Sequence, residues 1–343
     1  GVKTSVGFLE SGKYPENTAL LTVKCENGET VKVLGTSVGG GSIAISEVDG
    51  VKMNVNADAW HLVIWSSSEI PSDMFEESVS VQVGKNETEY ISCISFADQP
   101  DTELTEKIAG LLQVRRMKIV APVLPYGMTR ISEKLCGSCE EVCKKAAEKA
   151  CSLTEIAIEY EMKRSGHTRE QIREQMKKHL EQIKKSVVEG EKGNQMLYGL
   201  TSGHDGPRML KAIEDGKTVS GGIVPKAVAR ALGVMEYNGA MGCIVAAPTA
   251  GSSGIVPGSM VTVQQEYGFS DEKIEDALFV ASLMGVVMEN RDVSFSGSVG
   301  GCQGEVGVSS AITAAAITSL FTDDPVAITH AMAICLKNLL GLV

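Results

Sequence analysis

Aromatic residues are scarce in this 343-residue chain. They make up 5% of it, whereas hydrophobic residues together make up 43% and glycine alone contributes 36 residues. We therefore expect cores built from aliphatic and small side chains that pack closely. Basic residues are also in deficit, because 32 lysines and arginines stand against 43 aspartates and glutamates, a net charge of −11. A nucleic-acid partner, which would need a basic face, is not expected.

The chain also lacks long apolar runs and a recognisable leader. Its longest uncharged apolar run, 277–288, is shorter than the roughly 20 residues that a membrane helix needs, so no membrane partner is expected. The start has no apolar stretch of a signal peptide and no Met, and the end is an apolar run, so we expect the sequence to be cut at both ends. Nine cysteines in such an acidic chain favour a reducing cytoplasm over a disulfide framework.

The first 125 residues or so predict a small α+β layer. Two apolar strands flank the hairpin turn at Glu26-Asn27-Gly28, and a further strand is expected over 42–46. More strands are expected over 61–65, 78–83, 90–96 and 117–120, with a helix over 101–112. The proline-rich stretch 121–127 is the predicted linker to the next domain.

From Ser132 onward the pattern predicts helices almost throughout. Thr168-Arg169-Glu170-Gln171 has the form of a capping box, and Asp324-Pro325 is expected to begin the last helix. Glycine is concentrated in three predicted interhelical connections, 199–206, 239–258 and 297–307. An all-α domain that places its glycine in such loops is expected to use them for a site.

The third connection holds one thiol among glycines, in Ser298-Val299-Gly300-Gly301-Cys302-Gln303-Gly304-Glu305-Val306-Gly307. Glycine lets the main chain approach a bulky inorganic group or an anion. The small residues 309–316 favour a helix, whose N-terminus would then face the thiol. Both features lower the pKa of a cysteine and favour the thiolate, the form that binds metal or attacks. A buried cysteine at a tight turn is the alternative.

A second group of cysteines lies in Cys136-Gly137-Ser138-Cys139-Glu140-Glu141-Val142-Cys143, with Cys151 further on. Their spacing superficially suggests an iron–sulfur or zinc site. The same spacing is one stripe of a helix, and a helix presents thiols in a row, whereas a metal site usually needs a loop that wraps around the ion. Buried thiols on a helix face, an auxiliary metal site and redox chemistry remain the three interpretations.

Several long motifs resemble signatures of the iron–sulfur L-serine dehydratases. In the helical part they are Ala246-Ala247-Pro248-Thr249-Ala250-Gly251-Ser252-Ser253-Gly254-Ile255-Val256-Pro257-Gly258, the run Gly300–Gly307 and the run Leu336–Val343. In the first part, Asn17-Thr18-Ala19 and the run Gly35–Ile45 resemble the second module of the same enzymes. The resemblance covers about residues 5–60 and 130–343, in order.

This resemblance implies deamination of L-serine to pyruvate and ammonia, a reaction of amino-acid catabolism and gluconeogenesis. It implies a [4Fe-4S] cluster held by three cysteines, whose open iron acts as a Lewis acid on the substrate hydroxyl. Cys302 matches the first cluster cysteine, and the other two belong to a segment that follows residue 343 in relatives. The serine-rich, histidine-containing substrate loop of the family is also absent. The chain as given is therefore not expected to assemble a complete site.

The same resemblance supplies the other candidate site residues. Thr249, Ser252 and Ser253 are expected to hold the substrate carboxylate, unless their loop is a plain Gly/Pro turn. Gly39, Gly40 and Gly41 either form a strand bulge or line a cleft between modules. Lys337, a charge within an apolar helix, has either a buried role or an ammonium that extends to solvent. The catalytic base is unknown.

The predicted architecture is α+β. It comprises a partial beta-type module over 1–60, a degenerate ACT-like module over 61–121 and an incomplete all-α catalytic domain of the alpha type over 130–343. The early helix of the ACT-like module is shortened to around 69–77, which puts effector binding there in doubt. We expect a homodimer. The alternatives to an L-serine lyase are a non-catalytic regulatory or partner-binding relative without the cluster, and a lyase for another β-substituted amino acid, such as threonine or cysteine.

Overall fold

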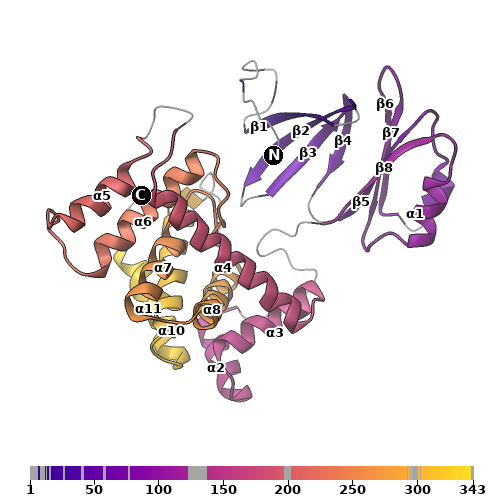
Figure 1. Ribbon diagram of the computed structural model, residues 1–343. Coiled ribbons are helices and arrows are strands. Elements are labelled where there is room, and N and C mark those ends of the chain that lie inside the picture. Colours follow the sequence, from indigo (N-terminus) through magenta and orange to yellow (C-terminus); the bar gives the residue numbers. More distant parts are fainter. Residues whose placement is uncertain are drawn as a thin grey trace. The chain divides into compact units, whose positions relative to one another are not determined.

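The chain folds into two units. The computed structural model describes residues 17–25, 28–39, 42–56, 59–75, 78–122, 137–196, 202–291, 300–301 and 303–340, with the single residues 7, 12, 14, 293 and 295. One unit comprises Gly1–Met128 and the other Thr129–Val343 (Figure 1). The first is built of two sheets with little helix and the second of helices, which confirms the predicted α+β class with an all-α C-terminal part.

The first sheet is an antiparallel meander. Its strands, in spatial order, are β1 (Thr18–Lys24), β2 (Thr30–Gly39), β3 (Ser42–Val48) and β4 (Val51–Val55). The pairing of β1 with β2 confirms the hairpin predicted around Gly28. Strand β4 was not predicted: its inward Val51, Met53 and Val55 alternate with exposed residues, as in a half-buried strand, but the strand is only 5 residues long.

The second sheet has the strand order of a split β-α-β fold. The strands β5 (Trp60–Ser66), β6 (Ser80–Lys85), β7 (Tyr90–Phe96) and β8 (Val114–Val120) lie in the order β6-β7-β5-β8, all antiparallel. The 3-10 turn η1 (Ser72–Phe75) follows β5, and helix α1 (Thr102–Ala109) precedes β8. The short η1 lies where the sequence predicts a shortened early helix.

Both faces of the second sheet are covered, which explains why β5 and β7 are hydrophobic at nearly every position. On one face, Ile64 and Ile94 pack with Phe75 and Ile108 from η1 and α1. On the other face, residues of β5 and β7 form one cluster with residues of the first sheet. The members of this shared cluster are Val48, Val51, Met53, Val55, Val63, Trp65, Ile91 and Cys93. The two sheets of this unit therefore share a core.

The second unit is helical in all the elements that the structure describes. Its elements are α2 (Cys139–Lys149), α3 (Leu153–Ser165), α4 (Arg169–Glu191), α5 (Asp205–Glu214), α6 (Ile223–Gly239), α7 (Ile255–Tyr267), α8 (Asp271–Glu289), the π-helical turn η2 (Gln303–Gly307), α10 (Val308–Ser319) and α11 (Pro325–Asn338). The Thr168 capping box is present, and Asp324 caps α11 as predicted. No helix among the described residues is both long and apolar enough to cross a membrane.

Helix α8 forms the centre of the helical core. Residues 277–281 and 283–288 are all buried, and α8 contacts α3, α4 and α10 (Figure 1). The cluster around it consists mainly of Ala, Val, Ile, Leu and Met side chains, with Phe279 as its one fully buried aromatic ring. The expectation of an aliphatic, small-residue core is confirmed.

Glycines bring several of these helices into backbone contact. Gly190 of α4 and Gly233 of α6 face each other, and a Cβ added at Gly233 would lie 2.9 Å from the carbonyl carbon of Gly190. A Cβ at Gly258 of α7 would lie 2.6 Å from the backbone nitrogen of Ala231 in α6. The predicted loop 239–258 is thus wrong at its end, because Gly258 lies within α7 and is used for close helix packing.

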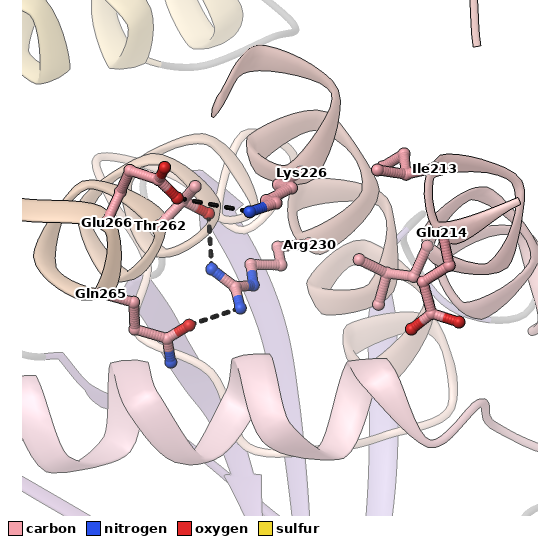
Figure 2. A pocket seen from close by; sticks show the side chains of 8 residues that line it. Ile213, Glu214, Lys226, Arg230, Thr262, Gln265 and Glu266 are labelled. Atoms are coloured by element: carbon pink, nitrogen blue, oxygen red, sulfur yellow. Dashed lines mark hydrogen bonds and ion pairs between the residues drawn. The ribbon is translucent and has the colours of Figure 1, made fainter. Parts of the chain in front are cut away.

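One arginine connects three of the helices. Nε of Arg230 in α6 donates to Glu191 in α4 at 2.7 Å. Its terminal nitrogens donate to Thr262 at 2.9 Å and Gln265 at 2.6 Å, both in α7 (Figure 2). The side chain of Arg230 is only 12% exposed. Its guanidinium is therefore held in one orientation.

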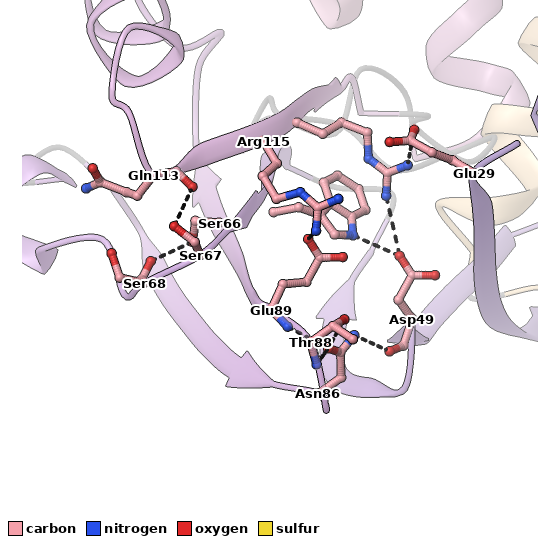
Figure 3. A network of polar contacts seen from close by, with 12 residues as sticks. Glu29, Asp49, Ser66, Ser67, Ser68, Asn86, Thr88, Glu89, Gln113 and Arg115 are labelled. Atoms are coloured by element: carbon pink, nitrogen blue, oxygen red, sulfur yellow. Dashed lines mark hydrogen bonds and ion pairs between the residues drawn. The ribbon is translucent and has the colours of Figure 1, made fainter. Parts of the chain in front are cut away.

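A carboxylate connects the two sheets of the first unit. Asp49, in the turn between β3 and β4, accepts a hydrogen bond from Nε1 of Trp65 at 2.8 Å (Figure 3). It also accepts one from the amide of Lys32 at 2.6 Å. Arg116 of β8 lies over the Trp65 ring, 3.8 Å from its centroid, and pairs with Asp49 at 3.4 Å. Asn86 donates to the carbonyl of Asp49 at 3.0 Å. This turn thus contacts three strands and the β6–β7 connection.

Candidate functional site

The loop 246–254 joins α6 to α7 and is held from two sides. On one side, the Asn238 side chain at the end of α6 donates to the carbonyl of Ala250 at 3.3 Å. On the other, the Ser309 hydroxyl in the first turn of α10 lies 2.7 Å from the carbonyl of Ala247 and 3.4 Å from that of Ser252. The loop therefore has a fixed place between three helices.

The three predicted substrate-binding hydroxyls lie together in this loop and are buried. Thr249, Ser252 and Ser253 are 4%, 2% and 0% exposed. The Thr249 and Ser252 hydroxyls lie 3.1 Å apart, and Ser253 donates to the carbonyl of Ala250 at 2.8 Å. Only one of the first two hydroxyls can donate within the pair, which leaves the other hydrogen available for a ligand.

One helix N-terminus adjoins the loop. Helix α7 begins directly after Gly254 and has no side-chain cap. The positive end of its dipole therefore lies at the end of the loop. A helix N-terminus of this kind suits the carboxylate of a small ligand.

A carboxylate from the cysteine motif also contacts the loop. Glu305, in η2, lies directly over Gly251: a Cβ added there would come within 2.6 Å of its Oε2 and 3.0 Å of its Cδ. The Gln303 side chain in the same turn donates to the carbonyl of Leu339, after the end of α11. Glu305 is half-buried and is the acidic side chain that the structure places against this loop.

Other predicted site residues are not brought to this loop by the described structure. Cys302, Gly40 and Gly41 lie outside the described residues. Gly39 ends β2 opposite Ser42, next to a register shift, which agrees with the strand-bulge interpretation at that position. Lys337 lies in the last turn of α11 and is exposed, so a buried role for it is not supported.

Asn238, Glu305 and Ser309 were missed as site residues by sequence reasoning. Glu305 stands within the cysteine motif itself, so its position in that motif was an available signal. Ser309 lies in the first turn of a helix that was predicted, but nothing local indicates that its hydroxyl bonds a loop far away in the sequence. Asn238 gives no local signal either.

The second cysteine group has the geometry of a helix face. Cys139 and Cys143 lie on α2 and are half-buried, and Cys139 and Cys151 pack against the helical core. The Cys143 sulfur lies 3.7 Å from the Thr329 hydroxyl, and burial raises the pKa of the Cys139 thiol. These contacts favour the structural interpretation for the described thiols. Cys136 lies outside the described residues.

The fold and the loop together define an all-α unit with a buried loop that carries three hydroxyl groups next to a helix N-terminus. A family model described as "Serine dehydratase alpha chain" matches residues 148–343 of the chain, which is most of this unit. The chain belongs to that family.

Individual relatives agree with the family match. The probable L-serine dehydratase alpha chain of Bacillus subtilis (strain 168) is 39% identical over 204 residues, which cover 60% of this chain and 67% of the relative. The L-serine dehydratase alpha chain of Peptoniphilus asaccharolyticus is 32% identical over 204 residues, covering 59% of this chain and 69% of the relative. An L-serine dehydratase of Haemophilus influenzae is 35% identical over 113 residues, which cover 33% of this chain and 25% of the relative.

Proposed function

We propose that this chain catalyses the deamination of L-serine to pyruvate and ammonia. The observation that carries the proposal is its membership of the serine dehydratase alpha chain family over residues 148–343. That range includes both the loop 246–254 and the motif around Cys302. Relatives that match over this region are named L-serine dehydratases.

The reaction is an elimination followed by a hydrolysis. A proton leaves Cα, the hydroxyl leaves Cβ and the two depart as water, which gives 2-aminoacrylate. Its imine tautomer then takes up one water molecule and releases ammonia, which leaves pyruvate. The net change is therefore serine to pyruvate and ammonia, and the chain must hold the substrate carboxylate and move one proton.

We assign the first of these tasks to the loop and the second to Glu305. Thr249, Ser252 and Ser253 lie beside the uncapped first turn of α7, where a carboxylate gains from the helix dipole and from the hydroxyl groups. Glu305 of η2 lies over Gly251 of this loop, and its carboxylate is able to accept or return a proton.

The family resemblance implies a [4Fe-4S] cluster, with Cys302 as one ligand. Cysteine thiolates are the usual ligands of such clusters. Among the residues that the structure describes, no group of three or more histidine, cysteine, aspartate or glutamate side chains is placed to hold a metal. The described residues therefore do not provide a complete set of ligands for a cluster. The roles proposed for the loop and for Glu305 involve only the chain's own residues.

Anaerobic reconstitution of the full-length protein with iron and sulfide tests the proposal. We expect broad visible absorption and pyruvate formation from L-serine, both lost in Cys302→Ala and both kept in the control Cys243→Ala, whose thiol is exposed. A folded protein that stays colourless and inactive would instead favour a non-catalytic relative. L-Threonine and L-cysteine, assayed in parallel, test the substrate choice.

We also propose that the protein is a homodimer of the reducing cytoplasm. The seven cysteines that the structure describes are all free thiols, which is compatible with such a compartment. Light scattering coupled to size-exclusion chromatography tests the dimer, because a mass of one chain across the working concentration range would contradict it.

A further inference from the structure

A pocket lies in the helical unit, between α5, α6 and α7. Its volume is about 310 Å³, near the lower end of the range for pockets that hold small molecules. The lining residues are Leu210, Ile213, Glu214, Lys226, Arg230, Thr262, Gln265 and Glu266 (Figure 2). Thr262 lies eight residues after Gly254, so it is about 12 Å along α7 from the loop 246–254. The pocket is therefore separate from that loop.

Arg230 gives this pocket a preorganised anion-binding group. Its bonds to Glu191, Thr262 and Gln265 use three of the five guanidinium N–H groups. One N–H remains on each terminal nitrogen, and no other described residue accepts a hydrogen bond from either. An arginine held in one orientation loses little further entropy when a carboxylate binds to it.

The remaining charges favour a ligand that carries both signs. Lys226 contributes a second cation and is paired with Glu266 at 3.3 Å. Glu214 lies on the opposite side of the pocket from Gln265 and Glu266, and it forms no ion pair with another described residue (Figure 2). Three carboxylates, those of Glu191, Glu214 and Glu266, stand against the two cations of Lys226 and Arg230. A multiply charged anion is therefore disfavoured as a ligand. A zwitterion matches this arrangement.

The other lining side chains select for an aliphatic group. Leu210 and Ile213 lie one turn apart on α5, and both are only partly buried, so they present apolar surface to the pocket. Covering that surface is favourable in proportion to its area.

We propose that this pocket binds an aliphatic α-amino acid. The carboxylate lies at Arg230 and Lys226, the ammonium at Glu214, and the side chain against Leu210 and Ile213. The bound amino acid contacts three helices, of which α6 also carries Asn238, the partner of Ala250 in the loop. The site is a ligand site in addition to the proposed L-serine site and does not depend on that activity.

Isothermal titration of the full-length protein with L-valine tests the proposal, because L-valine has no β-hydroxyl group and cannot undergo the proposed reaction. Isovalerate lacks the ammonium of L-valine, and isobutylamine lacks its carboxylate. We expect each to bind about tenfold more weakly than L-valine, since each loses one charged contact. Equal affinity for all three compounds would overturn the proposal. So would the absence of L-valine binding at about 10 mM, which is on the order of the dissociation constant expected from a few weak contacts.

Variants separate this pocket from the loop. Lys226→Met and Glu214→Gln should each weaken L-valine binding about tenfold, and Glu214→Gln should leave the affinity for isovalerate unchanged. Lys178→Met, which removes an exposed lysine of α4 from a comparable ion pair, is the matched control and should bind normally. Glu214 is exposed and the Lys226 side chain is 44% exposed, so both variants should fold, which circular dichroism verifies. L-valine binding that is unaffected by Lys226→Met and Glu214→Gln would place it elsewhere and overturn the proposal.

Discussion

At the scale of single residues, Gly251 leaves room for a carboxylate. A side chain there would displace Glu305, whose Oε2 lies 2.6 Å from the position of the missing Cβ. The two residues are far apart in the sequence, and each stands in a different motif. Local patterns therefore identify both motifs but do not indicate that they meet, because that contact depends on how α7 and α10 pack.

We expect Gly251→Ala to reduce activity with little loss of stability. The new methyl group meets the flexible end of Glu305 and not a backbone atom, so the fold can adjust while the carboxylate moves away. If Glu305 moves the proton, kcat for L-serine should fall at least about tenfold, and in Glu305→Gln about 100-fold. Steady-state kinetics on the reconstituted enzyme measure both.

Gly221→Ala is the control for this pair, because a Cβ at Gly221 meets no atom within 4 Å. Its kcat should match that of the unmodified enzyme. Full activity in both Gly251→Ala and Glu305→Gln would remove Glu305 from the mechanism.

A second residue-scale prediction concerns Cys93. Burial raises the pKa of its thiol to about 11, and its sulfur lies 3.8 Å from Nδ1 of the buried His61. At pH 8 about one part in a thousand of this thiol is therefore the reactive thiolate. Iodoacetamide should modify the exposed Cys25 and Cys243 at least 100-fold faster than Cys93. Peptide mass spectrometry over a time course measures each rate. Rapid modification of Cys93 in folded protein would contradict the burial described for it.

At the scale of elements, local signals predicted most helices and strands correctly. Thr168 and Asp324 cap helices where their side chains and following residues indicate. Errors occur where glycine is interpreted as a loop residue. Gly258 lies inside α7, because the absence of a side chain allows α7 to approach Ala231 of α6. Sequence spacing cannot distinguish such a glycine from one in a turn.

Helix α6 supplies a test of this packing. Gly233→Ala should destabilise the protein by about 1–3 kcal/mol, because the new Cβ would lie 2.9 Å from backbone atoms of Gly190, which cannot move independently. Helix propensity alone predicts the opposite effect of this substitution, an increase of up to about 1 kcal/mol in the free energy of unfolding. Urea unfolding followed by circular dichroism decides between them.

The control lies in the same helix. A Cβ at Gly239 would meet only the terminal methyl group of Met196, a flexible neighbour, at 2.7 Å. Gly239→Ala should therefore change the free energy of unfolding by less than about 0.5 kcal/mol. Equal effects of the two substitutions would mean that backbone contact with α4 does not limit residue 233.

At the scale of the whole molecule, the α+β class with a helical C-terminal part followed from the sequence, but the connection between the two sheets did not. The turn at Asp49 has φ of 48°, a left-handed conformation that aspartate tolerates. Its role depends on Trp65 and Arg116, from strands that follow much later in the chain. Such a network forms only when both sheets have packed together, so no local or periodic pattern in the sequence predicts it.

Asp49→Asn should destabilise the first unit by about 2 kcal/mol, because the charged acceptor of Trp65, Arg116 and the Lys32 amide is lost while the left-handed turn is kept. Both tryptophans of the chain, Trp60 and Trp65, lie in this unit, so tryptophan fluorescence during urea unfolding reports on it. Asp73→Asn, an exposed residue of η1, is the control and should have no measurable effect. An unchanged midpoint in Asp49→Asn would show that the network does not stabilise the sheets.

The paired glycines of α4 and α6 have a consequence for how this sequence can vary. At Gly190 and Gly233 the facing group is backbone in both directions, so a larger residue at one position cannot be offset by a smaller one at the other. In a library of all substitutions selected for folded protein, glycine should be strongly enriched at these two positions, alanine should be depleted, and larger residues should be excluded. Exposed neighbours on the same helices, such as Glu174 and Val228, should accept most residues. The set of residues accepted at each position of a helix would then indicate how closely that position approaches the neighbouring helix.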